Sequence, residues 1–366
     1  MFRLSELDRR RVRQFRKNRR ALWSLRIFSV LLVISLLADV IANDRPLLVS
    51  YDGKWHYPIV TDYSEATFGG DPEIAKADYL DPLTQCLIRT GGNEDPCLDE
   101  ADGGEKAKLL KGKQEGWIVW PLIRFSYDTD DKQVDHWPSA PDATHLLGTD
   151  DKGRDVLARI IYGFRLSVLF GFAVTVISAL IGIIAGAAQG FFGGWVDLFF
   201  QRVEEVWASM NLLYVLMIVA SVIVPNIWIM FLIFVAFSWT SLIGVVRAEF
   251  LRARNFEYVQ AARALGVGDW RIMFRHLLPN AMVATLTFLP FMLTASISLL
   301  AGLDYLGFGL GSEYPSLGEL ANQGKKHIQD IWLALSAFFT FAIMLSLMIF
   351  IFEGVRDAFD PRKTFR

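Results

Sequence analysis

The residues that could carry covalent or metal chemistry in this chain are few and widely spaced. Its five histidines are scattered: His56, His136, His145, His276 and His327. None of them begins His-Glu-x-x-His, the spacing that puts two zinc ligands and a base on one helix face. The phosphate-binding pattern G-x-x-x-x-G-K-[ST] is absent as well. We therefore expect no catalytic residue, no metal site and no cofactor bound by this chain.

The two cysteines, Cys86 and Cys97, lie near one another in a polar segment. In an oxidising compartment they can form a disulfide, which would constrain the unfolded chain by about 2–3 kcal/mol. Two unpaired thiols are the alternative. The pair is therefore a possible disulfide.

The segment 247–280 has the most informative spacing in the chain. Asn255 is a candidate N-cap, and Gly266 is a candidate stop for the helix between them, because Asn favours helix starts and Gly favours the left-handed residue after a helix. Apolar residues recur at i, i+3, i+4 and i+7 on one face: Tyr258, Ala261, Ala262 and Leu265. The two alanines predict a shallow surface that another protein can approach closely. A helix lying flat on a membrane would show the same pattern.

The elements that position this loop are long apolar stretches. Residues of the hydrophobic class make up 53% of the chain, and six stretches are long enough to cross a membrane as helices of roughly 20 residues. They are Leu22–Ile41, Leu166–Ala188, Val206–Val224, Ile227–Val246, Ala281–Leu303 and Ile331–Phe352. The second contains Gly182, Gly186 and Gly190 at four-residue spacing, which predicts close packing against another helix. The fold class is therefore an all-α membrane protein with six transmembrane helices.

Charge sets the expected orientation of these helices. Residues 1–26 contain ten Arg and Lys residues and only two acids. Cytoplasmic segments near membrane spans are rich in basic residues, so the N-terminus is expected inside. Alternating six spans then places 247–280 inside, where six arginines face three acids, and puts the C-terminus inside as well.

The expected organisation has five parts. They are a cytoplasmic basic N-terminus (1–21), a first transmembrane helix (22–41), a periplasmic module (42–165), a five-helix permease core (166–352) and a cytoplasmic tail (353–366). The module has turn signals and scattered aromatic residues, which predict mixed structure. Asp39 lies near the outer end of the first span and is expected to reach water there rather than relay protons.

The loop resembles the EAA motif of ABC-importer permeases of the oligopeptide, dipeptide and nickel type. It has Ala261-Ala262, three further residues, Gly266, and nine more before His276-Leu277-Leu278-Pro279. Gln260 stands where most of the family has Glu, and His276 stands where Ile is usual. Both departures resemble the peptide and nickel permeases.

Further blocks carry the same resemblance. Residues Leu147–Ser167 resemble the signature before the second span, and Leu303–Gly309 with Pro315–Gly318 resembles the outer loop before the last span. Arg356–Arg362 is similar to the usual C-terminal block. The start of the module, Ile41–Leu48, resembles the Yej-type branch, which imports longer peptides and the peptide-nucleotide antibiotic microcin C.

The resemblance implies a transporter subunit of the type I ABC-importer permease fold that is not itself an enzyme. It implies a second permease subunit, a cytoplasmic ABC ATPase that binds ATP and Mg, and a periplasmic peptide-binding protein, all at a bacterial inner membrane. The implied ATPase-coupling residues are Tyr258, Gln260, Ala261, Ala262, Leu265, Gly266, His276, Leu278 and Pro279. We expect His276 to cap or pack beneath the loop.

The alternatives are a dipeptide or nickel permease of the same family, a membrane sensor, and an ion-coupled carrier. A sensor would need a sizeable cytoplasmic output domain, and no segment in the expected organisation provides one. An ion-coupled carrier would need buried acids or histidines within its spans, and the six stretches contain no such chain of residues.

Overall fold

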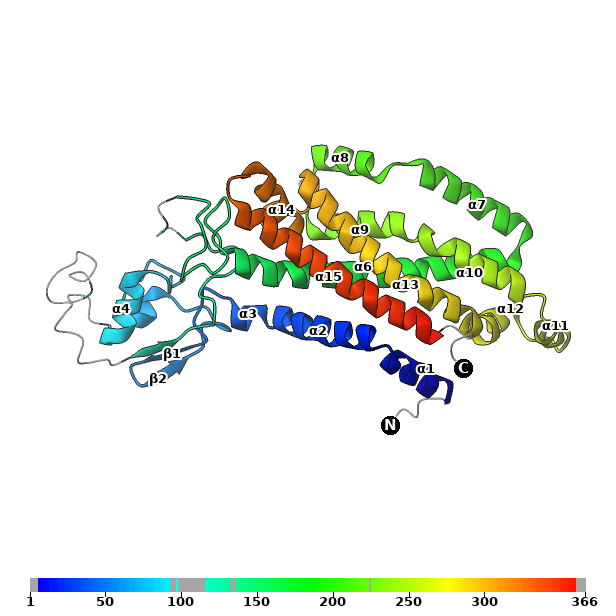
Figure 1. Ribbon diagram of the computed structural model, residues 1–366, viewed down its shortest axis with the longest axis horizontal. Helices are drawn as coiled ribbons and strands as arrows, with labels where there is room; N and C mark the ends of the chain where they lie inside the picture. The colour runs from blue at the N-terminus through cyan, green and yellow to red at the C-terminus, as the bar shows by residue number, and fades with distance from the viewer. Residues whose placement is uncertain are drawn as a thin grey trace. The chain divides into compact units, whose positions relative to one another are not determined.

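The computed structural model describes residues 6–92, 97, 116–131, 134, 136–223 and 225–359 (Figure 1). Asp360, Pro361 and Arg362 of the expected C-terminal block lie outside the described residues. The chain divides into two compact units. The helical unit comprises Met1–Leu32 and Gly163–Arg366, and the inserted unit comprises Val33–Tyr162.

The helical unit contains the following elements, in chain order. They are α1 (Glu6–Lys17), α2 (Arg19–Leu36, ending beyond the unit), α6 (Val156–Phe192, starting before it), α7 (Gly194–Ser209), α8 (Leu212–Val222), α9 (Ile227–Ser238), α10 (Thr240–Ala253), α11 (Glu257–Ala264), α12 (Asp269–Arg271), the π-helical turn η4 (Ile272–Leu277), α13 (Leu278–Leu306), α14 (Leu317–Lys326) and α15 (Ile331–Phe359).

Four described helical stretches are long and apolar enough to cross a membrane, and a bent pair could form a fifth. The four are Val156–Phe192, Ile227–Ala253, Thr285–Leu306 and Ile331–Phe359. The first expected span is not among them, because α2 contains Arg19, Arg20 and Arg26 and ends at Leu36, before the short helix α3 (Ala38–Ile41). Helix α15 continues past the expected end of the last span to Phe359.

The expected third span, 206–224, is wrong as a single helix. It is divided between α7 and α8, which bend by 67° at the break. The break lies at Met210 and Asn211, where the Asn211 side chain accepts a hydrogen bond from the Leu213 N–H and starts α8. In a continuous helix the Leu213 N–H would donate to a backbone carbonyl of the preceding turn. The Asn211 side chain takes the place of that carbonyl, so a new helix starts here and α7 does not continue.

The four-residue glycine spacing of α6 serves a contact with α10. A Cβ atom at Gly182, Gly186 or Gly190 would lie 2.6–2.8 Å from the carbonyl oxygens of Trp239, Ile243 and Arg247 respectively. Only glycine permits backbones to approach this closely. The two helices share a core in which Ala179, Ile183, Leu242 and Val246 are buried.

The inserted unit contains a three-stranded sheet in the order β2-β1-β3. Strand β1 (Leu48–Tyr51) pairs antiparallel with β2 (Lys54–His56) and with β3 (Trp117–Val119). The β1–β2 loop is Asp52-Gly53, and both residues have positive φ, as a two-residue hairpin of this type requires. The 3₁₀ turn η1 (Glu65–Phe68) and helix α4 (Pro82–Thr90) pack near the sheet, and Val49, Phe68, Tyr79 and Ile88 form the core.

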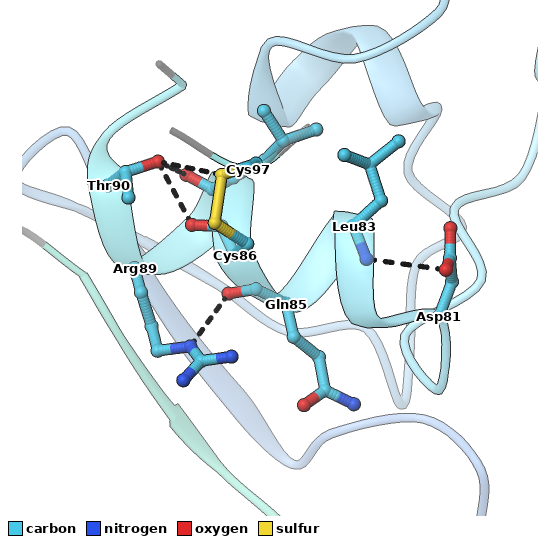
Figure 2. The surroundings of a disulfide bond; sticks show 8 residues. Asp81, Leu83, Gln85, Cys86, Arg89, Thr90 and Cys97 are labelled. Atoms are coloured by element: carbon cyan, nitrogen blue, oxygen red, sulfur yellow. Dashed lines mark hydrogen bonds between the residues drawn. A yellow bond between two sulfur atoms is a disulfide. The ribbon is translucent and has the colours of Figure 1, made fainter. Parts of the chain in front are cut away.

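Helix α4 carries one of the two cysteines. Its N-cap is Asp81, whose side chain accepts a hydrogen bond from the Leu83 N–H, and Cys86 on its buried face is bonded to Cys97 (Figure 2). Both cysteines are buried, and Thr90 Oγ1 lies 3.5 Å from Cys97 Sγ. The bond fixes residue 97 against the helix.

Candidate functional site

The loop between α10 and α13 contains the helix that the apolar spacing predicts, but its start differs from the expectation. Asn255 does not cap it: α11 begins at Glu257, and Phe256 occupies the N-cap position without a side-chain cap. The Asn255 carbonyl instead accepts a hydrogen bond from Gln260 Nε2 at 3.3 Å. The Gln260 side chain therefore bonds back to the backbone just before the helix. An ionised Glu side chain at this position would have no proton to donate.

The end of α11 is the predicted one. Gly266 has a φ of 75°, in the left-handed region. Its N–H donates to the Arg263 carbonyl, and the Val267 N–H donates to the Ala262 carbonyl. These two bonds form a Schellman motif, which satisfies the last carbonyls of a helix. Val267 and Ala262 also pack against the same apolar cluster, which is the contact that accompanies this motif.

The buried side of α11 takes in one residue of the face that the sequence predicts as a contact surface, namely Ala262. Val259 is fully buried and Ala262 is half-buried against a cluster that includes Phe250 of α10, Ile272 of η4 and Phe191 of α6. Ala262 is therefore part of the anchor. Val259 and Ala262 are three residues apart and share a helix face, but the sequence offers two such apolar faces and does not say which one packs inward.

The opposite side of the helix is exposed. Leu265 is 84% exposed and Tyr258 is 42% exposed, and Ala261 is exposed between them along the chain. Two further large side chains of the loop, which the sequence analysis did not single out, are also exposed: Phe256 at 43%, whose ring lies beside Tyr258, and Trp270 of α12 at 64%. We call these five residues the outer α11 surface: Phe256, Tyr258, Ala261, Leu265 and Trp270. Large apolar side chains concentrated on one loop are typical of a surface that contacts another molecule.

Polar contacts hold the loop on the helices behind it. The Arg263 guanidinium lies 4.9 Å from the centre of the Phe191 ring and 3.6 Å from Asp269. Arg254 Nη1 donates to the Gly190 carbonyl. The outer α11 surface is thus mounted on the ends of α6 and α10 rather than on a free loop.

The end of the expected motif divides between exposed and buried positions. His276 is exposed in η4, so it does not pack beneath the loop, and its expected capping role stays a prediction. Leu277 is buried, Leu278 is half-buried against the cluster, and Pro279 is exposed at the start of α13. A π-helical turn holds an extra residue, which shifts the side chains that follow from the face that a regular helix predicts.

Two other recognised blocks also form polar centres. In the helical unit, the Asp304 carboxylate accepts a 2.6 Å hydrogen bond from the Leu310 N–H and another from Ser316 Oγ, and Ser316 in turn caps α14. Asp304 therefore closes the turn between α13 and α14.

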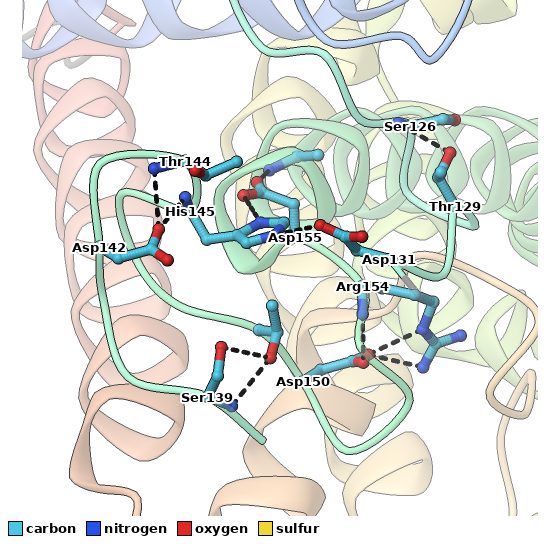
Figure 3. Close-up of polar contacts among 12 residues, drawn as sticks. Ser126, Thr129, Asp131, Ser139, Asp142, Thr144, His145, Asp150, Arg154 and Asp155 are labelled. Atoms are coloured by element: carbon cyan, nitrogen blue, oxygen red, sulfur yellow. Dashed lines mark hydrogen bonds and ion pairs between the residues drawn. The ribbon is translucent and has the colours of Figure 1, made fainter. Parts of the chain in front are cut away.

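The polar centre of the inserted unit surrounds His145 (Figure 3). Its Nδ1 lies 2.9 Å from Asp155 Oδ2 and its Nε2 lies 3.2 Å from Asp131 Oδ2. Burial opposes a charged imidazole, but the hydrogen bonds to Asp155 and Asp131 outweigh it and raise the pKa of His145. Arg154 pairs with Asp150 at 2.6 Å beside this site. The sequence analysis named His145 only as one of the scattered histidines, because its partners Asp131 and Asp155 are not close to it in the sequence.

Residues 158–365 match the family described as binding-protein-dependent transport system inner membrane component. The chain belongs to this family. Residues 9–62 match the N-terminal transmembrane domain of oligopeptide transport permease C. The chain is therefore an inner membrane permease component of an ABC importer, a family whose members are not themselves enzymes.

Individual relatives agree with the family. The chain is 50% identical to the inner membrane ABC transporter permease protein YejE of Escherichia coli, with 99% of both chains covered. It is 49% identical to the peptidoglycan transport system permease protein YejE of Agrobacterium fabrum, covering 99% of this chain and 95% of the relative. It is 30% identical to the oligopeptide transport system permease protein OppC of Haemophilus influenzae, over 65% of this chain and 77% of the relative.

Proposed function

We propose that this chain is the permease subunit of a peptide importer and that the outer α11 surface is the docking site of its ATPase. One observation carries the docking assignment: α11 exposes Leu265, Tyr258 and Ala261 while its other side is fixed by the buried Val259. A helix that exposes apolar residues and is anchored from behind can transmit a push from its partner to the helices on which it is mounted.

The path of that push follows the contacts of the loop. Val259 and Ala262 lie against Phe250, Ile272 and Phe191, so a displacement of α11 displaces α10, η4 and α6 together. Packed interiors transmit displacement because they contain little free space. ATP binding at the partner supplies the free-energy difference between the two orientations of the permease, since a ligand shifts an equilibrium only by its differential affinity.

The membrane arrangement is part of the proposal. Six spans would follow if α2 with α3 and the bent pair α7–α8 each cross the membrane beside the four long helices. The basic residues of α1 and of the α10–α13 loop favour a cytoplasmic location for both, and alternation of six spans would put the C-terminus on the same side. The inserted unit then lies in the periplasm, where the Cys86–Cys97 bond can persist.

The cargo is proposed from the names of the relatives. Several relatives are named for peptide, oligopeptide or dipeptide transport, and one is named for peptidoglycan, a polymer that carries short peptides, so peptides are the cargo class that we propose. The identity over the whole chain favours the Yej-type branch and therefore longer peptides, including antibiotics of the microcin C kind. Dipeptides and nickel are the alternative cargoes within the family, and one relative is a dipeptide transport system permease.

Reconstitution tests this function. The chain would be placed in proteoliposomes with its partner permease, its ATPase and a peptide-binding protein, and uptake of a labelled peptide would be followed with and without ATP. We expect uptake that needs ATP and every one of these subunits. Uptake of nickel but not peptide would contradict the cargo, and uptake that proceeds without the ATPase would contradict the mechanism.

A further inference from the structure

An open groove of about 420 Å³ lies in the helical unit, where the start of the chain meets the last long helix. Its described lining comes from the α1–α2 junction and from α15, and consists of Lys17, Asn18, Arg19, Arg20, Phe350 and Glu353. Three bases and one acid give this lining a net charge of +2. The groove therefore attracts anions.

Close packing fixes the two walls of the groove against one another. A Cβ atom at Gly354 of α15 would lie against the Ala21 Cβ and 3.0 Å from Phe15 Cε2, so only glycine permits this approach. Ala21 is fully buried. The Arg11 guanidinium lies 4.6 Å from the centre of the Phe359 ring, near the end of α15. The groove is thus formed by packed helices rather than by a loop.

The bases of the groove are available to a ligand. Lys17, Arg19 and Arg20 are exposed, and none of them forms an ion pair with another described residue. The Asn18 side chain is directed to the backbone, where it accepts a hydrogen bond from the Ala21 N–H at 3.2 Å. Guanidinium groups bind phosphate oxygens through paired N–H donors, and an ammonium group adds a point charge. A phosphate group fits these three side chains.

Exposed apolar faces continue from the groove along both helices. On α2, Trp23 and Ile27 follow Arg19 at four-residue spacing, and both are exposed. On α15, Ile343 and Phe350 are seven residues apart, and both are exposed on a helix long and apolar enough to cross a membrane. Residues at these spacings share a helix face. A ligand that covers the groove and these faces must combine an anionic group with apolar chains.

We propose that the groove binds an anionic phospholipid of the cytoplasmic leaflet. Its phosphate would lie at Lys17, Arg19 and Arg20, and its acyl chains along the exposed faces of α2 and α15. Basic pockets between helices on the cytoplasmic side of a membrane bind such headgroups. The proposal rests on the membrane arrangement in the proposed function, which favours a cytoplasmic location for α1. It adds a lipid ligand, which would hold the α1–α2 junction at the depth of the headgroups.

A fluorescent reporter beside the groove tests the proposal in the assembled importer. Among the described residues both cysteines are bonded to one another, so Ser346→Cys, at an exposed position one turn before Phe350, takes a bimane label alone. The labelled full chain would be reconstituted with its partner subunits in phosphatidylcholine vesicles that contain a small fraction of brominated lipid. Quenching of bimane by brominated phosphatidylglycerol, compared with brominated phosphatidylcholine, measures which lipid occupies the site.

We expect phosphatidylglycerol to be enriched about tenfold over phosphatidylcholine at the label, and the enrichment to fall with added salt. Inorganic phosphate at matched ionic strength should leave the quenching unchanged, because it has no acyl chains. Arg19→Gln combined with Arg20→Gln should remove most of the enrichment. Arg9→Gln combined with Arg13→Gln is the matched control: it removes the same charge from exposed positions of α1 outside the groove and should keep the enrichment within about twofold.

Four outcomes would overturn the proposal. They are equal quenching by the two brominated lipids, equal losses in the two double variants, which would show a diffuse basic surface only, displacement of the lipid by inorganic phosphate, and loss of the ATPase subunit from the Arg19→Gln, Arg20→Gln assembly with its quenching unchanged. ATP-driven peptide uptake by the same vesicles separates the two hypotheses. Uptake that persists without a preference for phosphatidylglycerol overturns only this inference, and lipid enrichment without uptake contradicts only the proposed function.

Discussion

Arg247 on α10 and Asp197 on α7 form a bidentate ion pair, with Nε–Oδ1 at 2.6 Å and Nη2–Oδ2 at 2.8 Å. Arg247 lies on α10, which leads into the loop that contains α11, one turn before Phe250, which belongs to the cluster on the buried side of α11. The pair therefore joins α7 to the helix through which the proposed push must pass.

Breaking this pair should loosen the connection between α7 and α10. Both side chains are partly shielded, at 30% and 15% exposure, so we expect Asp197→Ala to destabilise the protein by about 1–3 kcal/mol. A double-mutant cycle with Arg247→Met, read by thermal unfolding in detergent, measures the coupling between the two. The exposed pair Arg252–Glu249 is the control and should give under about 1 kcal/mol. Similar coupling energies for both pairs would refute the prediction.

Close packing of α6 on α10 gives a second prediction. Gly186→Ala places a Cβ 2.8 Å from the Ile243 carbonyl oxygen, and we expect a loss of about 1–3 kcal/mol in the free energy of unfolding. Gly302→Ala in α13 is the matched control, because its Cβ meets no atom within 4 Å. It should be neutral or stabilising by about 0.5–1 kcal/mol. Equal stabilities of the two variants would show that the helices are not in contact as described.

The pKa of His145 predicts a pH dependence of stability. The folded pKa is raised above the unfolded value of about 6.5, so its stabilising contribution is complete below that pH and is lost as pH rises through the folded pKa. His145→Gln leaves Asp155 and Asp131 without a cation and should cost about 3–5 kcal/mol at pH 6.

Thermal unfolding of the two proteins between pH 5.5 and 9 tests this, and the range is chosen to bracket the ordinary histidine pKa. The groups that face the His145 ring are Asp155, Asp131 and the Phe125 ring. The Asp142 carboxylate accepts a hydrogen bond from the His145 backbone N–H. We expect the stability difference between wild type and His145→Gln to shrink as pH rises. A difference that stays constant with pH would contradict the charged state of the imidazole.

The two alanines of the motif should behave differently. Ala261 is exposed, so Ala261→Trp should leave thermal stability unchanged and abolish ATP-dependent uptake by obstructing the docking surface. Ala262 packs against the buried cluster, so Ala262→Trp should lower the free energy of unfolding by about 1–3 kcal/mol in addition to abolishing uptake. Uptake and thermal unfolding of both variants check this. Normal uptake by Ala261→Trp would contradict the docking assignment.

The sequence predicted those parts of the site that depend on local patterns. Gly266 ends α11 because no other residue enters the left-handed region so readily, and the glycine spacing of α6 marks a close helix contact. The inward position of Val259 and the exposure of Trp270 depend on how α6, α10 and η4 pack around the loop. Hydrophobic periodicity does not contain that information.

Long-range and polar features escaped prediction for related reasons. Hydropathy predicted one continuous helix through Asn211, where the structure has a break between α7 and α8. The Asn211 side chain caps a new helix there, and hydropathy does not register such a cap. His145 finds Asp131 and Asp155 only once the chain has folded.

Photo-crosslinking from residue 265 tests the central claim most directly. Leu265, at 84% exposure, would be replaced by p-benzoylphenylalanine in the assembled importer, with Val60 of the inserted unit, at 83% exposure, as the control position. The account predicts that irradiation links position 265 to the ATPase subunit and leaves position 60 unlinked to it. An assembly that hydrolyses ATP and takes up peptide, yet gives no ATPase crosslink from position 265, would contradict the docking of the ATPase on α11.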